Sequence, residues 1–127
     1  MARELQQIER LFTNLITTGA TKFPSSRQRL EAPAELGVYV IFNSSGAAVH
    51  VGRTPRAKGG IAQRLKDHLY GRSSFTYYYL NGDGEKLRNK FSFKCLVVKN
   101  DRERVLLEHY ATAHLCPKHL GVGRSVS

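Results

Sequence analysis

The chain has 127 residues, the size of one ordinary globular domain, and can bury a modest core without metal or disulfide cross-links. Its 20 lysine and arginine residues outnumber 10 acidic residues, so the formal net charge is +10 and nucleic acid is the favoured partner. No apolar run is long enough to cross a bilayer, and residues 1–4 lead into a charged amphipathic pattern where a signal peptide would be apolar, so we expect a cytoplasmic protein.

The first predicted element is an amphipathic helix over residues 3–18, which ends at Gly19. One helical face carries the apolar side chains, which are Leu5, Ile8, Leu11, Phe12, Leu15 and Ile16. This helix packs either on the rest of the domain or on a second copy of the chain. Residues 21–35 contain prolines and several polar and basic side chains, which predicts an irregular linker. Residues 1–36 are therefore expected to form a helix and a linker in front of the main domain.

Two short apolar runs, residues 37–42 and 47–52, flank the turn-forming segment 43–46, which predicts a β-hairpin. A loop of two or four residues would place Tyr39 opposite His50. Because side chains alternate between the two faces of a strand, we expect these two side chains on one face. The other face would carry Val38, Val40, Phe42, Val49 and Val51.

A helix is predicted over residues 60–70, because apolar residues recur there at every fourth position. These apolar residues are Ile61, Leu65 and Leu69. Arg64 and His68 lie one turn apart beside this stripe. The preceding loop, residues 53–59, is basic and contains glycine but lacks the spacing of a nucleotide-binding loop, so we expect it to hold a DNA backbone.

Basic residues gather around the hairpin and this helix. They are Arg53, Arg56, Lys58, Arg64, Lys66, Arg72, Lys86, Arg88, Lys90 and Lys94, opposed there by Asp67, Asp83 and Glu85. Such a cluster forms either a solvated surface or a phosphate-binding face, and its position favours the second. Residues 71–90 show no helical or strand period, and the tyrosines at 77–79 either cover a core or stack on bases.

The last predicted elements are a third strand and a final helix. Apolar and polar residues alternate over 91–97, which predicts the strand, and Asn100 is expected to cap a helix that reaches about residue 114. Glu108 in this helix has apolar neighbours, so its carboxylate needs a cation. The cation is either a metal ion or a salt-bridge partner, Arg104 or Arg64. The order hairpin, helix, strand, helix predicts an α+β domain with a small antiparallel sheet.

Three segments together resemble the GIY-YIG nuclease superfamily, which includes homing endonucleases, repair incision subunits and some restriction enzymes. They are GVY at 37–39, HVG at 50–52 after a gap of ten residues, and RLKDH at 64–68. The likeness covers roughly residues 37–120 and is closest to the small restriction-type members. It implies a three-stranded antiparallel sheet flanked by helices, DNA as substrate, and Mg²⁺ or Mn²⁺ as cofactor. Residues 121–127 would form a flexible tail.

The resemblance implies five catalytic residues. Tyr39 takes the position of the tyrosine that contacts or deprotonates the attacking water. Arg64 would stabilise the transition state because its planar fork suits phosphate oxygens. His68 would hydrogen-bond the phosphate or the tyrosines, and Glu108 matches the single metal-binding glutamate, which presents one carboxylate to a hydrated Mg²⁺. His50 replaces the second tyrosine of the family, where it either assists proton transfer or weakens positioning.

A second departure concerns the end of the last helix, where Leu120 stands at the position of an asparagine that family members often carry. Either His119 or Lys118 replaces the phosphate contact of that amide, or the site is impaired. We expect DNA contacts from Arg53, Arg56, Lys58, Lys66, Arg72, Lys118 and His119. The predicted function is a metal-dependent DNA endonuclease, with a homodimer if both strands are cut, and the alternative is a nucleic-acid-binding module that does not cleave. A nuclease directed at RNA would rest on charge alone.

Overall fold

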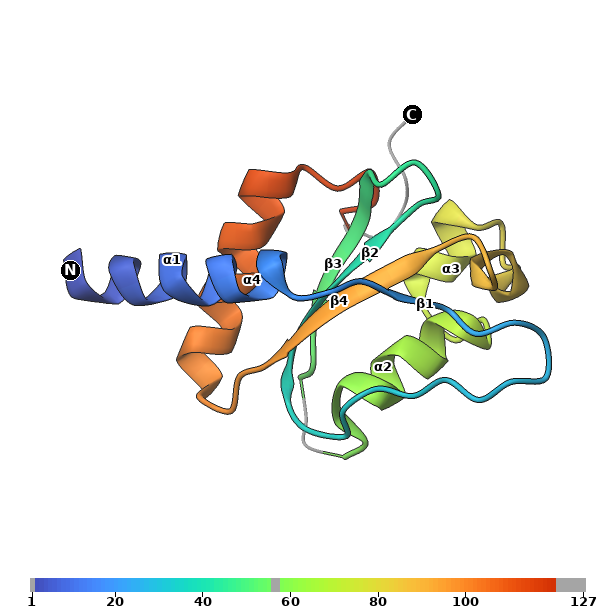
Figure 1. Ribbon diagram of the computed structural model, residues 1–127, viewed down its shortest axis with the longest axis horizontal. Helices are drawn as coiled ribbons and strands as arrows, with labels where there is room; N and C mark the ends of the chain where they lie inside the picture. Colours follow the sequence, from blue (N-terminus) through green and yellow to red (C-terminus); the bar gives the residue numbers. More distant parts are fainter. Residues whose placement is uncertain (1, 56–57, 121–127) are drawn as a thin grey trace.

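The computed structural model describes residues 2–55 and 58–120. Its elements, in chain order, are α1 (Ala2–Thr17), β1 (Thr21–Lys22), β2 (Gly37–Phe42), β3 (Ala48–Arg53), α2 (Gly60–Leu69), α3 (Ser74–Tyr79), the 3-10 turn η1 (Gly84–Leu87), β4 (Ser92–Val97) and α4 (Asp101–Leu115). The strands form one antiparallel sheet in the order β1-β4-β2-β3. Helices α2 and α3 lie on one side of this sheet, and α1 and α4 lie on the other (Figure 1). The predicted α+β class is confirmed, and β1 adds a fourth strand to the predicted three.

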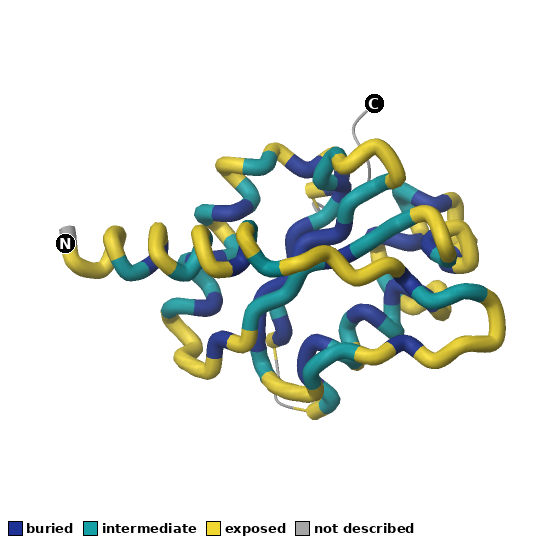
Figure 2. Tube along the Cα trace, in the orientation of Figure 1, coloured by how far each residue is buried: buried dark blue, intermediate teal, exposed yellow. Residues whose placement is uncertain are grey.

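Strand β2 is the centre of the fold, because it has a neighbour on each edge and a helical layer on each face. Its side chains alternate as predicted. Val38 and Val40 enter the apolar cluster beneath α1 and α4, whereas Tyr39 and Ile41 enter the cluster beneath α2. Figure 2 shows the resulting buried stretch through the middle of the sheet. Tyr39 is therefore held on both sides by packed strands and from above by a helix.

The predicted register of the hairpin is wrong by two residues. Tyr39 lies opposite Gly52, and His50 lies opposite Ile41. The loop causes the first residue of this shift, because Asn43 pairs its backbone with Ala47 and Gly46 adopts a positive φ of 85°, which closes a three-residue turn. The register then shifts between Ile41 and Phe42, which indicates a β-bulge.

The bulge places one side chain of the hairpin on the face opposite to the predicted one and leaves the others on their predicted faces. Val49 belongs to the cluster on the Tyr39 face, although simple alternation had placed it on the face of Val51. Tyr39 and His50 still share one face, with ring centroids 5.9 Å apart. The loop and the bulge each shift the register by one residue, so together they keep the phenol and the imidazole on one face.

The amphipathic helix α1 packs on its own domain. Ile8 and Leu15 are buried in the cluster that also contains Leu107 and Ala111 of α4. Arg102 of α4 donates to the Glu4 carboxylate at 2.6 Å, which ties the exposed sides of the two helices together. None of the helices in residues 2–55 and 58–120 is both long and apolar enough to span a bilayer.

Three short elements, β1, α3 and η1, were not predicted from the sequence. Strand β1 has only two residues and pairs with β4, so it leaves no alternation pattern. Helix α3 lies in the aromatic segment Ser74–Tyr79, where hydrophobic residues follow one another without a helical period. Its start is marked by Ser73, whose side chain accepts a hydrogen bond from the backbone of Thr76. The other predicted helices and strands are present within one or two residues of their predicted ends.

Candidate active site

The centre of the candidate site is the buried, tightly packed phenol of Tyr39. Tyr39 is fully buried, and its ring lies across the backbone of Gly52 on the neighbouring strand. A Cβ atom at position 52 would stand 2.3 Å from the Tyr39 hydroxyl, so only glycine fits there. The glycine of the HVG segment is therefore needed for the space it leaves to the tyrosine.

The Tyr39 hydroxyl contacts a buried imidazole from α2. Its oxygen lies 2.6 Å from Nε2 of His68, and His68 is 1% exposed. Burial raises the pKa of Tyr39 above its ordinary value, while the nearby positive charge of Arg64 opposes that rise. Burial also holds the pKa of His68 well below its ordinary value. Both groups are therefore neutral near pH 7, and the phenol is the natural donor of the proton they share.

His68 is held on its other side by hydroxyl groups that the sequence pattern did not reveal. Nδ1 of His68 lies 2.6 Å from the Ser73 hydroxyl, which lies 3.2 Å from the Thr76 hydroxyl. The Thr76 hydroxyl in turn donates to the backbone carbonyl of His68. A serine just before an aromatic run is a helix-capping signal, and this was the one sequence cue to these residues.

Two further imidazoles surround Phe75 next to this network. His50 stacks on Phe75 at 4.8 Å between ring centroids, and His119 lies 5.4 Å from His50 and 5.6 Å from Phe75. The backbone N–H of His119 donates to the Val49 carbonyl at 2.9 Å, which fastens the segment after α4 to the edge of β3. Burial lowers the pKa of His50 to about 3 and that of His119 below its ordinary value. His50 and His119 are thus neutral donors or acceptors at physiological pH.

Arg64 supplies the cation on this face. The Arg64 side chain is about one-third exposed, and its guanidinium lies 3.5 Å from an Asp67 carboxylate oxygen, so the two residues form an ion pair. The Nε of Arg64 is buried without a hydrogen-bond partner. Within residues 2–55 and 58–120, the buried side-chain nitrogens that lack a hydrogen-bond partner are Arg64 Nε, His50 Nδ1 and His119 Nε2. Unpaired buried polar atoms are costly, and their concentration here is typical of a ligand site.

Glu108 reaches the site from the opposite layer of the sheet. It lies on α4, its side chain is 20% exposed, and Nη1 of Arg53 donates to its Oε1. The expected partners Arg104 and Arg64 are engaged elsewhere, since Arg104 is buried against Asp101 at 2.7 Å and Arg64 pairs with Asp67. The cation that Glu108 requires is therefore supplied by the last residue of β3.

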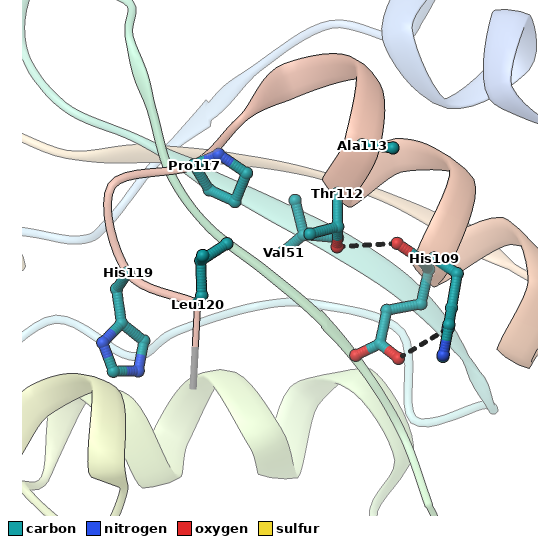
Figure 3. A pocket seen from close by; sticks show the side chains of 8 residues that line it. Val51, His109, Thr112, Ala113, Pro117, His119 and Leu120 are labelled. Carbon is teal, nitrogen blue, oxygen red and sulfur yellow. Dashed lines mark hydrogen bonds and ion pairs between the residues drawn. The ribbon is translucent and has the colours of Figure 1, made fainter. Parts of the chain in front are cut away.

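A pocket of about 320 Å³ joins Glu108 to the imidazole cluster at the open edge of β3. Figure 3 shows His109 and Thr112 of α4 on one side of this pocket and His119 and Leu120 on the other. His119 lines the pocket and also packs on His50, so it connects the two layers. The negative charge of Glu108 is close enough to add to the rise in the pKa of Tyr39, although burial is the main cause.

The donor set suits a largely hydrated ion better than a protein-enclosed one. Among the residues that the structure describes, no group of three His, Cys, Asp or Glu side chains is arranged to hold a metal. Glu108 provides a single carboxylate beside a pocket of about 320 Å³, which has room for an ion and its waters, and it already holds a guanidinium. A divalent cation with one carboxylate and several waters fits these groups, as Mg²⁺ commonly binds.

The predicted DNA-binding residues divide into two sets. Lys58, Arg72 and Lys118 are exposed and Lys66 is half-buried, so their charges are accessible to a polyanion. Arg72 also lies over the exposed ring of Tyr70, 5.4 Å from its centroid, and 3.2 Å from Asp67. Arg53 is half-buried and pairs with Glu108, His119 is buried, and Arg56 lies outside the described residues.

The three tyrosines at 77–79 differ in how far they are buried. Tyr79 stacks on Phe75 and packs on the core, as the less specific interpretation predicted. Tyr77 is 66% exposed and contacts Tyr78 edge-on. The run thus forms part of the core at one end and part of the surface at the other.

Comparison with solved structures identifies similar folds. Two crystal structures of the GIY-YIG N-terminal endonuclease domain of UvrC from Thermotoga maritima match with a probability of 1.00 and a TM-score of 0.50. Both are tyrosine-to-phenylalanine point mutants bound to their catalytic divalent cation. Each is 26% identical to this chain, and the match covers 70% of this chain and 86% of that domain. No protein-family model matches the chain, and no curated protein sequence matches it.

Proposed function

Because the chain belongs to the GIY-YIG nuclease superfamily, we propose that it is a DNA endonuclease that hydrolyses phosphodiester bonds with the help of a divalent cation. The observation that supports this most strongly is the buried Tyr39 hydroxyl bonded to His68 Nε2, beside the unpaired nitrogens of Arg64 and His119. A proton acceptor, a guanidinium and a lone carboxylate are the groups that such hydrolysis requires.

Tyr39 and His68 would act together as the base. Burial disfavours a phenolate, so Tyr39 alone is a poor base at neutral pH. If the attacking water gives its proton to the Tyr39 oxygen while Tyr39 gives its own proton to His68 Nε2, no free phenolate forms. The proton ends on the imidazole, and the water oxygen bonds to phosphorus. This concerted transfer starts from two neutral groups and avoids the phenolate that burial disfavours.

Arg64, His119 and Glu108 would stabilise the charge of the transition state. The Arg64 guanidinium would hold the non-bridging phosphate oxygens in a planar fork. His119, with a buried and unpaired Nε2, is better placed than exposed Lys118 to replace the missing asparagine contact. Glu108 would hold the divalent cation, which when bound offsets the charge on the departing 3′ oxygen. Mg²⁺ is the ion we propose, since a single carboxylate suits it.

The restriction-type role and the dimer are further parts of the proposal. The overall similarity of residues 37–120 to small restriction-type members supports the first. One such site cuts one strand, so a double-strand break would require two copies of the chain. The exposed residues Lys58, Arg72 and Lys118, together with the half-buried Lys66, would position the DNA backbone around the site.

Replacing Glu108 separates a nuclease from a module that only binds. Wild-type protein and Glu108→Ala are compared for plasmid cleavage in Mg²⁺ and for gel shift of the same DNA. We expect Glu108→Ala to lose cleavage and to retain the gel shift, because the carboxylate holds the cation and not the DNA. A wild-type protein that shifts DNA without cutting it would instead support the binding module, which the His50 and Leu120 departures motivate.

A further inference from the structure

We propose that Ser73 and Thr76 form a hydroxyl relay that fixes the proton of His68 on Nδ1 and so keeps Nε2 free to accept a proton from Tyr39. The inference builds on the proposed function, because it assigns positioning residues to the same base. Neither residue belongs to the motifs that resemble the family. Both lie in the segment after α2 that carried no periodic pattern.

The contacts form a closed ring that begins and ends on His68. Nδ1 of His68 lies 2.6 Å from Ser73 Oγ, and Ser73 Oγ lies 3.2 Å from Thr76 Oγ1. Thr76 Oγ1 then contacts the backbone carbonyl of His68. Thr76 is fully buried, so this hydroxyl acts within the protein and has no access to a substrate.

Counting protons around the ring selects one arrangement. A carbonyl can only accept, so the single Thr76 hydroxyl proton goes to the His68 carbonyl. Thr76 Oγ1 is then an acceptor, and the Ser73 hydroxyl donates its one proton there. Ser73 Oγ can only accept from the imidazole, so Nδ1 of His68 carries the hydrogen.

The same arrangement satisfies the remaining groups. Ser73 Oγ also accepts from the backbone N–H of Thr76 at 3.2 Å, which fills its second lone pair. A neutral imidazole with hydrogen on Nδ1 has a free lone pair on Nε2, so Tyr39 donates to it. In the opposite tautomer Ser73 would donate to Nδ1, and its 3.2 Å contact with Thr76 would contain no hydrogen. The hydroxyl pair thus sets the direction of the Tyr39 bond, as an orienting group does for a catalytic histidine.

Thr76→Val tests the relay with the least disturbance. Valine has the shape of threonine and keeps the Ser73 cap of α3, whereas Ser73→Ala would remove the cap and the relay together. In Thr76→Val the Ser73 hydroxyl loses its acceptor and becomes free to donate to Nδ1. We therefore expect the His68 hydrogen to move to Nε2, which abolishes the acceptor for Tyr39.

The primary readout is nitrogen NMR of histidine-labelled protein, in which Nδ1 and Nε2 of His68 have distinct chemical shifts in each tautomer. Wild-type protein is expected to show hydrogen on Nδ1, and Thr76→Val to show hydrogen on Nε2 with cleavage reduced by about 10- to 100-fold. Thr76→Ser should restore both the tautomer and the rate. Loss of packing alone would lower the melting temperature without moving the hydrogen.

Two results would overturn the proposal. One is a wild-type spectrum with hydrogen on His68 Nε2, which needs no variant to fold. The other is an unchanged tautomer in folded Thr76→Val. If the wild-type protein cleaves no DNA but the tautomer changes as described, the relay stands and the proposed nuclease function fails.

Discussion

The phenolic oxygen of Tyr39 lies 2.6 Å from Nε2 of His68, although 29 positions separate the two residues in the chain. Tyr39 comes from the central strand and His68 from the helix that packs on it, so the bond joins the sheet to α2 at the floor of the site. Both side chains are buried and both are neutral at physiological pH. The proposed chemistry depends on this bond.

Removal of the Tyr39 hydroxyl should abolish cleavage while the fold is kept. Tyr39→Phe retains the ring that packs in the core and loses only the atom that relays the proton. We expect the cleavage rate to fall by about 10²- to 10⁴-fold, the usual contribution of a positioned acid or base. Tyr77→Phe, at an exposed tyrosine, is the matched control. Equal cleavage by Tyr39→Phe and the wild type would exclude Tyr39 from the reaction.

A methyl group at position 52 should disturb the same phenol. In Gly52→Ala the new Cβ would lie 2.3 Å from the Tyr39 hydroxyl, and the buried ring has no space into which to withdraw. We expect a loss of stability of about 1–3 kcal/mol from overpacking, together with a loss of cleavage. Gly19→Ala adds the same methyl group where no atom lies within 4 Å. Urea denaturation should show the loss in Gly52→Ala only, and equal stability of both variants would contradict the packing described.

The buried imidazoles predict a loss of stability in acid. Burial lowers the pKa of His50 from 6.5 to about 3 and lowers those of His68 and His119 as well. Below pH 6.5 these histidines bind protons in the unfolded chain but stay neutral in the folded chain. The free energy of unfolding therefore keeps its full value above pH 6.5 and decreases as the pH falls towards 3. Burial raises the pKa of Tyr39, so stability should also decrease as the pH rises above 10.0.

Urea denaturation of His50→Phe measures how much one imidazole contributes to the loss of stability in acid. Its free energy of unfolding should change less between about pH 7 and about pH 4.5 than that of the wild type, because the unfolded variant has one histidine fewer to protonate. His109→Ala removes an exposed histidine and is the control. A pH dependence that is the same in His50→Phe and the wild type would show that His50 is not buried as a neutral group.

Arg53 should compete with the divalent cation for Glu108, because its guanidinium already contacts Oε1 of that carboxylate. We expect Arg53→Gln to bind Mn²⁺ up to about 5-fold more tightly, since a partly exposed ion pair is worth up to about 1 kcal/mol. Arg72→Gln removes the same charge from a residue paired with Asp67. Calorimetric titration with Mn²⁺ that gives equal affinities for the two variants would argue against direct competition.

Most of the fold could be predicted because its elements are periodic. The stripe of Ile61, Leu65 and Leu69 identified α2, and the alternation over residues 91–97 identified β4. The hairpin register could not be predicted, because it depends on the positive φ of Gly46 and on a bulge that no residue type requires. Strand β1 is too short to leave a pattern, and the aromatic sequence of α3 conceals its helical period.

The candidate site was predicted in part. Arg64 and His68 lie on α2 as their spacing indicated, and Tyr39 and His50 share a face of the sheet. Contacts between distant parts of the chain could not be predicted. The partner of Glu108 is Arg53, 55 positions away, and the ring of Ser73 and Thr76 depends on how α3 packs against α2.

Plasmid cleavage by the wild-type protein is the measurement on which the proposed function most depends. Supercoiled plasmid is incubated with excess protein in Mg²⁺, in Mn²⁺ and in EDTA, with Tyr39→Phe in parallel to detect a contaminating nuclease. We predict nicked or linear product with either metal, none in EDTA, and little or none with Tyr39→Phe. Intact plasmid with both metals, under conditions in which the protein shifts the same DNA on a gel, would contradict an endonuclease.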